Sequence, residues 1–188
     1  MPRNRRPRDR EEKRAEIVDA ARELFLAVGF DNVSITQIAA AAGVTSTTIY
    51  WYFSGKDELL VAVLDGVLTT SLGRFDELAD TDPTDRIVWV VDELRSMSTL
   101  VDTVHTRRLS STLIDDWHTR FHTLADELTR AMLPPGLTPD VVQAQCRIAT
   151  FVIEGLLTHP LDFDETRAVA RSLAATIGAT GRASEQSR

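Results

Sequence analysis

Apolar residues recur at every third or fourth position along most of this chain, which is the spacing of helices with one buried face. Between Arg10 and Val28 they form a single stripe, and similar stripes follow Lys56, Pro83 and Thr138. No segment shows the sustained alternation of period two that indicates a strand. We therefore predict an all-α fold of about nine helices, near residues 10–28, 35–42, 46–53, 56–78, 83–94, 104–115, 117–133, 138–158 and 165–179.

The second and third predicted helices are short and carry clear start and stop signals. Ser34 can cap the second helix while Gln37, three residues later, reaches back to complete a capping box. Gly43 then supplies the left-handed conformation of a sharp turn, and Thr45 can cap the third helix. The segment 35–54 is therefore interpreted as a helix-turn-helix. Its apolar seam is predicted to contain Ile38, Val44 and Ile49.

The other positions of the third helix are short hydroxyls and large aromatics. Such side chains suit hydrogen bonds to phosphate and apolar contacts with thymine methyl groups, and a rigid helix would present them to DNA. Helical hairpins with a glycine turn also occur in enzymes, so this pattern alone leaves a purely structural hairpin open. The positions concerned are Ser46, Thr47, Thr48, Tyr50 and Trp51.

A longer stretch resembles the N-terminal domain of the tetracycline-repressor (TetR) family. Three motifs follow in the family's order and spacing across about a quarter of the chain, namely AARELF, SITQIAAAAGVTSTTIYWYF and GKDELL. The departures are small, with Ser34 where threonine is common and Tyr52 after Trp51. The resemblance implies a DNA-binding transcription regulator whose helical C-terminal domain differs with its ligand.

The resemblance also implies roles for single residues. On the second helix, Thr36 would contact a phosphate and Gln37 a base edge, a role that competes with capping. Tyr52 would contact phosphate or base, Phe53 is expected in the core, and Lys56 would bind an anion at the start of the fourth helix. On the third helix, the implied phosphate ligands are Thr45, Thr48 and Tyr50, the groove-facing residues are Ser46 and Thr47, and the reader of a thymine methyl is Trp51. For these aromatics, core packing is the alternative.

Charge is unevenly distributed along the chain. The net charge of −7 argues, taken whole, against a nucleic-acid binder. However, residues 1–56 carry nine Lys or Arg against seven Asp or Glu, whereas residues 57–188 carry twelve against twenty-one. The N-terminal part is therefore the one suited to phosphate. Arginines crowd its start and form either a phosphate-seeking arm or a solvated tail: Arg3, Arg5, Arg6, Arg8 and Arg10.

We predict a DNA-binding domain at residues 1–56 and a helical ligand-binding and dimerisation domain at residues 57–188. The segment 148–157 is apolar almost all round, with Glu154 as its only charge, so it needs partners on both faces. A second subunit would provide one of them, and a fully internal core is the alternative. The interface is predicted at Val152, Leu156, Leu173 and Ile177, and an apolar ligand cavity at Trp89, Met97, Leu100, His105, Trp117, Phe121 and Phe151.

Patterns typical of other functions are missing from the sequence. Cys146 is the only cysteine, so neither an intrachain disulfide nor a multi-cysteine zinc site is predicted, in agreement with a cytoplasmic protein. His118 and His122 share a helical face, which exposed helix surface explains better than metal binding. No phosphate loop or nucleophile elbow occurs, and no apolar run reaches the ~18 residues of a membrane span. We expect no enzyme, no cofactor, no metal and no membrane association.

The leading hypothesis is a homodimeric, cytoplasmic repressor. It would bind a partly palindromic, double-stranded operator and release it when an apolar or amphipathic small molecule binds. Two alternatives stay open: a helical small-molecule binding protein without operator binding, and a ligand-independent or activating regulator. Thr36, Tyr50, Lys56 and the arginine-rich start favour the first hypothesis.

Overall fold

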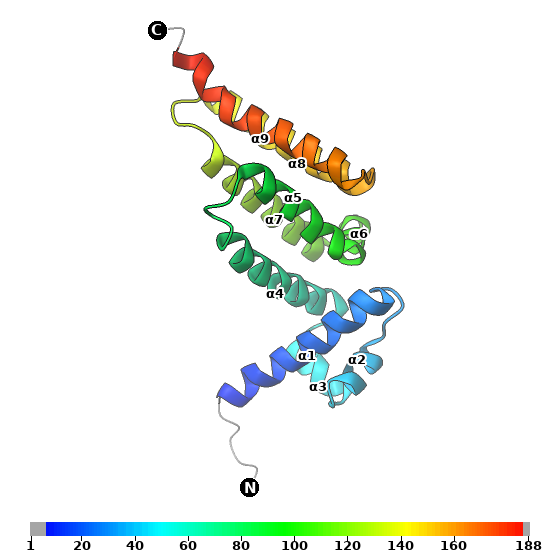
Figure 1. Cartoon of the computed structure of the whole chain (residues 1–188). Coiled ribbons are helices and arrows are strands. Elements are labelled where there is room, and N and C mark those ends of the chain that lie inside the picture. Colours follow the sequence, from blue (N-terminus) through cyan, green and yellow to red (C-terminus); the bar gives the residue numbers. More distant parts are fainter. Residues whose placement is uncertain (1–6, 186–188) are drawn as a thin grey trace. The chain divides into compact units, whose positions relative to one another are not determined.

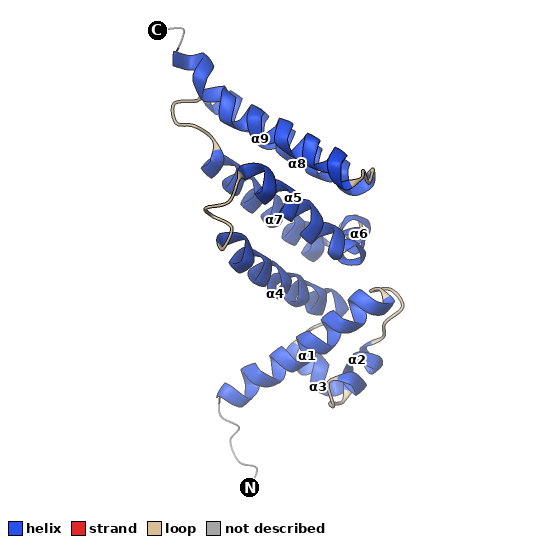
Figure 2. Cartoon of the chain, viewed as in Figure 1, coloured by secondary structure: helices blue, strands red, loops and turns tan. Residues whose placement is uncertain are grey.

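A computed structural model describes residues 7–185 of the chain (Figure 1). Within this range there are nine helices and no strand, so the all-α prediction is confirmed (Figure 2). None of the described helices is long and apolar enough to cross a membrane. The helices are α1 (Pro7–Val28), α2 (Ile35–Ala41), α3 (Ser46–Tyr52), α4 (Lys56–Asp76), α5 (Pro83–Ser96), α6 (Ser98–Arg107), α7 (Thr112–Met132), α8 (Pro139–Thr158) and α9 (Phe163–Glu185).

The described residues form two compact units. Unit 1 contains the residues up to Ser71 together with Met97–His118, and unit 2 contains Leu72–Ser96 and the residues from Thr119 onward. Both α4 and α7 therefore contribute residues to each unit. The expected boundary after residue 56 stays a prediction about independently folding domains.

The core of unit 1 follows the apolar stripe of α1. Ile17, Ala21 and Phe25 lie four residues apart and are fully buried, as one face of an amphipathic helix requires. The Phe25 ring packs 5.1 Å from the ring of Phe30, which follows the end of α1. α1 packs against α2 and α6, and α2 packs against α3. These contacts give the short helices α2 and α3 a fixed platform.

The start of α2 is held by the capping box that the sequence predicts. The Gln37 amide donates to Ser34 Oγ at 3.2 Å, and the Ser34 amide donates to Gln37 Oε1 at 2.8 Å. Ser34 Oγ also donates to Gln37 Oε1 at 2.8 Å. A seven-residue helix is too short to be stable alone, so its caps and its packing decide whether it forms.

Replacing Ser34 by Ala is expected to lower the free energy of unfolding by about 1 kcal/mol, because the Gln37 amide loses its acceptor, Ser34 Oγ, and Gln37 Oε1 loses the hydroxyl that donates to it. Urea denaturation followed by circular dichroism measures the change. Thr138→Ala is the matched control, since Thr138 is the N-cap of α8 but makes no side-chain capping hydrogen bond. An equal loss in the two variants would contradict the assigned role of the capping box.

Unit 2 is built on α5, α8 and α9, which pack against one another. Its buried cluster joins Ile87 and Val88 of α5 with Ala149 of α8 and with Leu173 and Ile177 of α9. Polar contacts also join the helices of unit 2. The Arg95 guanidinium of α5 donates to the carbonyl of Leu156 at 3.2 Å and to Thr166 Oγ1 at 3.4 Å.

Two predicted helix boundaries are wrong. The helices expected at 104–115 and 117–133 occur as Ser98–Arg107 and Thr112–Met132. α6 begins after Met97, which makes no side-chain cap, and the turn after Arg107 contains neither glycine nor proline. Instead, the amides of Ser110 and Ser111 both donate to the Arg107 carbonyl. Ordinary residues thus make this turn, and no sequence signal marks it.

Candidate nucleic-acid interface

The turn between α2 and α3 sets the angle of the helix-turn-helix. Gly43 adopts a φ of +64°, in the region that glycine favours, and the amide of Val44 donates to the Ala39 carbonyl at 2.9 Å. Ile38 and Ile49 are fully buried on either side of this turn. The predicted seam between the two helices is therefore present, with Val44 half-buried.

Hydroxyl groups gather where α2 and α3 begin. Thr45 Oγ1 accepts from the Thr48 amide at 3.1 Å and lies 3.0 Å from Thr48 Oγ1. Ser46 Oγ lies 3.5 Å from Thr36 Oγ1, which joins the first turns of the two helices. Thr45 therefore caps α3 as predicted. These residues are brought together in the structure, with Thr36 and Thr45 exposed to solvent and Ser46 and Thr48 half-buried.

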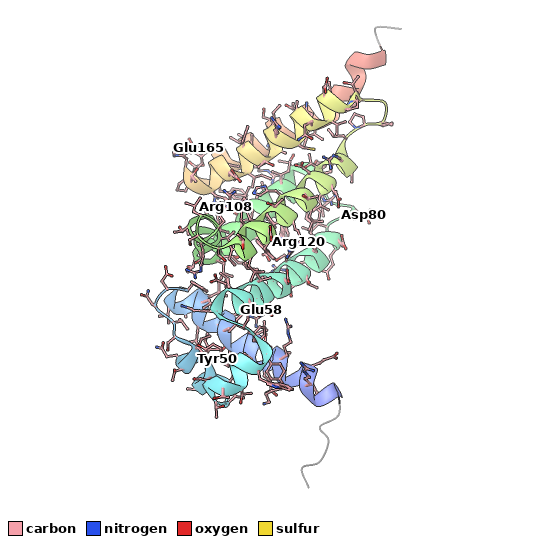
Figure 3. The ribbon with its side chains drawn as sticks, turned by 180° about the vertical axis from the view of Figure 1, so that it is seen from behind. Tyr50, Glu58, Asp80, Arg108, Arg120 and Glu165 are labelled. Atoms are coloured by element: carbon pink, nitrogen blue, oxygen red, sulfur yellow. The ribbon has the colours of Figure 1, made fainter. Side chains whose placement is uncertain are left out.

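The aromatic residues of α3 divide between surface and core. Tyr50 is 57% exposed and Trp51 is 66% exposed, whereas Phe53 is 1% exposed. Tyr52 is half-buried, and its ring meets the edge of the Trp51 ring at 5.3 Å between centroids. Figure 3 marks Tyr50 on α3 and Glu58 in the first turn of α4. The core position expected for Phe53 is confirmed, and core packing does not account for Tyr50 or Trp51.

Two arginines of α1 lie over aromatic rings of this segment. The Arg10 guanidinium lies 4.7 Å from the centroid of the Trp51 ring, and that of Arg14 lies 5.0 Å from the centroid of Phe53. Sequence reasoning did not find these contacts, although the four-residue spacing of Arg10 and Arg14 places both on one face of a helix. Of the predicted arginine arm, Arg3, Arg5 and Arg6 and the side chain of Arg8 lie outside the described residues.

The ammonium group of Lys56 already contacts another residue of unit 1. Its Nζ donates to the carbonyl of Phe30 and lies 4.1 Å from the centroid of the Phe30 ring. The Arg107 guanidinium of α6 lies 4.9 Å from the same ring and donates from Nε to Asp57 at 2.5 Å. Burial lowers the pKa of Lys56, and the charge of Arg107 adds to this effect, although the charges of Asp31 and Asp57 oppose it. The anion-binding role implied for Lys56 would require its ammonium to leave the Phe30 carbonyl or to share it.

The first turn of α4 holds two carboxylates in their charged form. Burial alone would raise the pKa of Asp57, but hydrogen bonds from Arg107 and Ser111 and the charges of Arg107 and Lys56 bring it below the ordinary value. Hydrogen bonds from the side chain and backbone of Ser54 lower the pKa of Glu58. The turn between α3 and α4 is thereby tied to α4, with the Ser54 amide 2.6 Å from Glu58 Oε2.

These lowered pKa values predict a loss of stability in acid. A carboxyl whose pKa is lower when folded stabilises the folded state above its unfolded pKa, and this contribution disappears as pH falls through the folded pKa. The ordinary values for Asp57 and Glu58 are 3.8 and 4.5. We therefore expect the urea midpoint of unfolding to fall as the pH is lowered below about 5. In Asp57→Asn the urea midpoint should fall less between neutral pH and about pH 4. A midpoint that depends on pH as steeply as in the wild type would contradict the role given to Asp57.

The residues of the predicted ligand cavity do not share one environment. Leu100 and Trp117 are buried in unit 1, where Trp117 Nε1 donates to Asp65 Oδ1 at 2.8 Å. In the same unit Met97 is half-buried, whereas His105 is exposed and its ring meets that of His118. In unit 2, Trp89 and Phe121 are half-buried, while Phe151 is 69% exposed. A cavity formed by the whole set stays a prediction.

Three of the four predicted interface residues lie in the core of unit 2. Leu156, Leu173 and Ile177 are each 4% exposed in the single chain, so they have almost no surface left for a partner. This corrects the prediction for these three residues, because the packing of α8 and α9 against α5 already buries them. Val152 is half-buried. The apolar surface of α8 lies instead at Ile148 and Phe151, which are 42% and 69% exposed.

Comparison with known proteins supports the interpretation of unit 1. Residues 17–63 match the model of the family described as bacterial regulatory proteins, tetR family. The HTH-type transcriptional regulator SrpR of Pseudomonas putida is 52% identical over 54 residues, which are 29% of this chain and 25% of SrpR. The chain spans only 25% to 48% of the length of the first curated relatives that it matches.

Solved structures share the fold over most of the chain. A transcriptional regulator from Rhodococcus sp. Rha1 superposes with a TM-score of 0.71 and 16% identity, covering 89% of this chain and 96% of that one. The multidrug binding protein EbrR, complexed with imidazole, has a TM-score of 0.63 and 18% identity, covering 86% of this chain and 94% of that one. At these identities the likeness shows the fold alone.

Proposed function

We propose that the protein is a transcriptional regulator that binds operator DNA, because its residues 17–63 match the model of the tetR family of bacterial regulatory proteins. It acts as a homodimeric repressor in the cytoplasm and catalyses no reaction. A small molecule bound by the helices beyond residue 56 releases it from the operator.

The exposure of Tyr50 and Trp51 is the observation that carries this proposal. Ile49 between the turn and these residues is fully buried, so α3 is anchored by one face while its large aromatics point away from the core. Side chains that stay this exposed contribute little burial of apolar surface to the stability of the fold. Together with the hydroxyls of Thr36, Thr47 and Thr48 they offer hydrogen bonds for phosphates and apolar contacts for base edges.

Titration of duplex DNA tests the proposal directly. The upstream region of the protein's own gene and a random duplex of equal length are titrated at several salt concentrations. We expect tighter binding to the upstream region, with a strong salt dependence because phosphate contacts release counterions. Equal affinity for both duplexes at every salt concentration would reject operator binding and leave a helical small-molecule binding protein.

Dimerisation is supported by the surface of α8. Ile148 and Phe151 form an exposed apolar pair one helical turn apart, on a helix whose other face packs into the core of unit 2. A second copy of the chain would cover this pair from its own α8, as a symmetric interface requires. Two linked recognition helices would then reach half-sites about 34 to 36 Å apart.

Release by a small molecule is supported by composition and by a structural neighbour. Residues 57–188 carry twelve basic against twenty-one acidic side chains, which disfavours anionic ligands and favours apolar or cationic ones. EbrR, which shares the fold, is described as a multidrug binding protein. Half-buried aromatics such as Trp89 and Phe121 would suit an apolar ligand.

A thermal-shift screen of apolar and amphipathic compounds, followed by titration with and without operator, tests the release. The two affinities must differ, because a ligand shifts the protein away from its DNA-binding state only by preferring another state. We expect operator DNA to weaken the binding of the ligand. Equal affinities would show that the ligand does not regulate DNA binding.

A further inference from the structure

The helix-turn-helix of this chain has no cation of its own. No Lys or Arg occurs between Arg22 and Lys56, a stretch that includes all of α2 and α3. Lys56 itself donates to the carbonyl of Phe30 and lies over the Phe30 ring. Because neutralised phosphates supply much of the affinity for DNA, the positive charge next to the recognition helix has to come from elsewhere.

α1 brings two arginines to α3, and the two differ in their surroundings. Arg14 lies over the buried Phe53 ring, and its charge also acts on Glu58 by lowering the pKa of that carboxyl. Arg10 is exposed and lies over the indole of Trp51, which is itself 66% exposed. None of the ion pairs found among the described residues involves Arg10.

A cation–π contact with Trp51 does not use up the hydrogen-bond donors of Arg10. A guanidinium meets an aromatic ring through its flat face, while its five N–H donors lie in the plane and point outward. Those donors match the oxygens of a phosphate, which can be bound by two of them at once. The ring also restricts a long, flexible side chain before DNA arrives, so less conformational entropy is lost on binding.

We propose that Arg10 is a phosphate-binding residue of the DNA interface and that the ring of Trp51 holds its guanidinium in position. Trp51 then has two functions, since one part of its indole faces the DNA bases and its ring face holds Arg10 beside the recognition helix. The inference rests on the proposed function, because it requires that the surface of α3 binds DNA. It assigns to α1 a phosphate contact by a cation, which the helix-turn-helix cannot make because α2 and α3 contain no Lys or Arg.

Salt dependence of binding by Arg10→Gln tests the phosphate contact. Each phosphate contact contributes about −0.9 to the slope of log K against log salt concentration, so loss of two contacts in a dimer should reduce the slope by about 1.8. Between 50 and 200 mM salt this corresponds to roughly a 12-fold smaller loss of affinity than in the wild type. Operator and random duplex should be affected alike, because phosphate contacts carry no base information.

Arg22→Gln is the matched control. It removes the same charge from the same helix, but Arg22 pairs with Asp19 at 3.3 Å and has no contact with α3 among the described interactions. Its slope should equal that of the wild type. An Arg10→Gln slope equal to that of Arg22→Gln would overturn the proposal, provided the wild type prefers the operator. A wild type without that preference would instead reject the proposed function.

Substitutions at Trp51 test whether its ring positions Arg10. In a Trp51→Ala background, Arg10→Gln should change the slope little, because Arg10 has already lost the ring that holds it. In a Trp51→Phe background a ring remains, and Arg10→Gln should keep most of its effect. If Arg10→Gln reduced the salt slope in the Trp51→Ala protein as much as in the wild type, Arg10 would bind phosphate without Trp51. That result would overturn the positioning role of Trp51. Thermal unfolding confirms that each variant is folded.

Discussion

Replacing Phe151 by Glu is expected to lower operator affinity by about 10²- to 10⁴-fold, which is the avidity lost when two binding modules are no longer linked. Phe151 is 69% exposed in the single chain, so the change should leave each monomer folded. In the proposed dimer it would place unpaired carboxylates in an apolar interface, where they are costly. Sedimentation at micromolar concentration should show a monomer, and titration with operator measures the loss of affinity.

Phe163→Glu is the control for this prediction. Phe163 is 64% exposed at the first position of α9, so the same substitution is made at an equally exposed aromatic residue. It should leave the dimer and the operator affinity unchanged. A dimeric Phe151→Glu protein that binds the operator normally would place the interface elsewhere, and a monomeric Phe163→Glu protein would point to the turn between α8 and α9.

Replacing Trp51 by Ala is expected to remove discrimination at one thymine of the operator, worth about 1 to 3 kcal/mol. The indole is the largest exposed apolar surface of α3 and suits the thymine methyl group. Replacing each thymine by uracil in turn removes only that methyl group. The wild type should lose about 1 kcal/mol of binding free energy at one position, which is the value of burying one methyl group. The affinity of Trp51→Ala should not change when the same thymine is replaced.

Tyr50→Ala separates base reading from phosphate binding. Tyr50 is the neighbouring exposed aromatic residue and is assigned a phosphate contact. Its loss should weaken binding to all sequences alike and leave the response to uracil unchanged. If Trp51→Ala also weakened binding to all sequences alike and kept the wild-type response to uracil, Trp51 would not read a base.

The elements found from the sequence are those governed by nearby residues. The capping box of Ser34 and Gln37 and the cap at Thr45 each join groups that are three positions apart, and the turn at Gly43 depends on the backbone of that one residue. Their signals are therefore local and can be read in one pass along the chain. The family resemblance then located the candidate site, because it covers this same local segment.

The contacts missed by sequence reasoning join distant parts of the chain. Arg10 and Trp51 are separated by forty-one positions, and Arg107 and Asp57 by fifty. No periodicity relates such pairs. The prediction that Leu173 and Ile177 lie in the dimer interface is wrong for a related reason, since core residues and interface residues are equally apolar. Only the packing of α5 shows that they are internal.

The capping box also restricts what Gln37 can recognise. Its Oε1 accepts from both the amide and the hydroxyl of Ser34, so both lone pairs of that oxygen are in use. Only the amide nitrogen remains for DNA, as a donor. A glutamine that reads adenine in the bidentate manner needs its oxygen for the N6 amino group. While the cap is intact, Gln37 is therefore suited to acceptor-only edges, such as N7 and O6 of guanine, and a strict preference for adenine would require α2 to give up its cap.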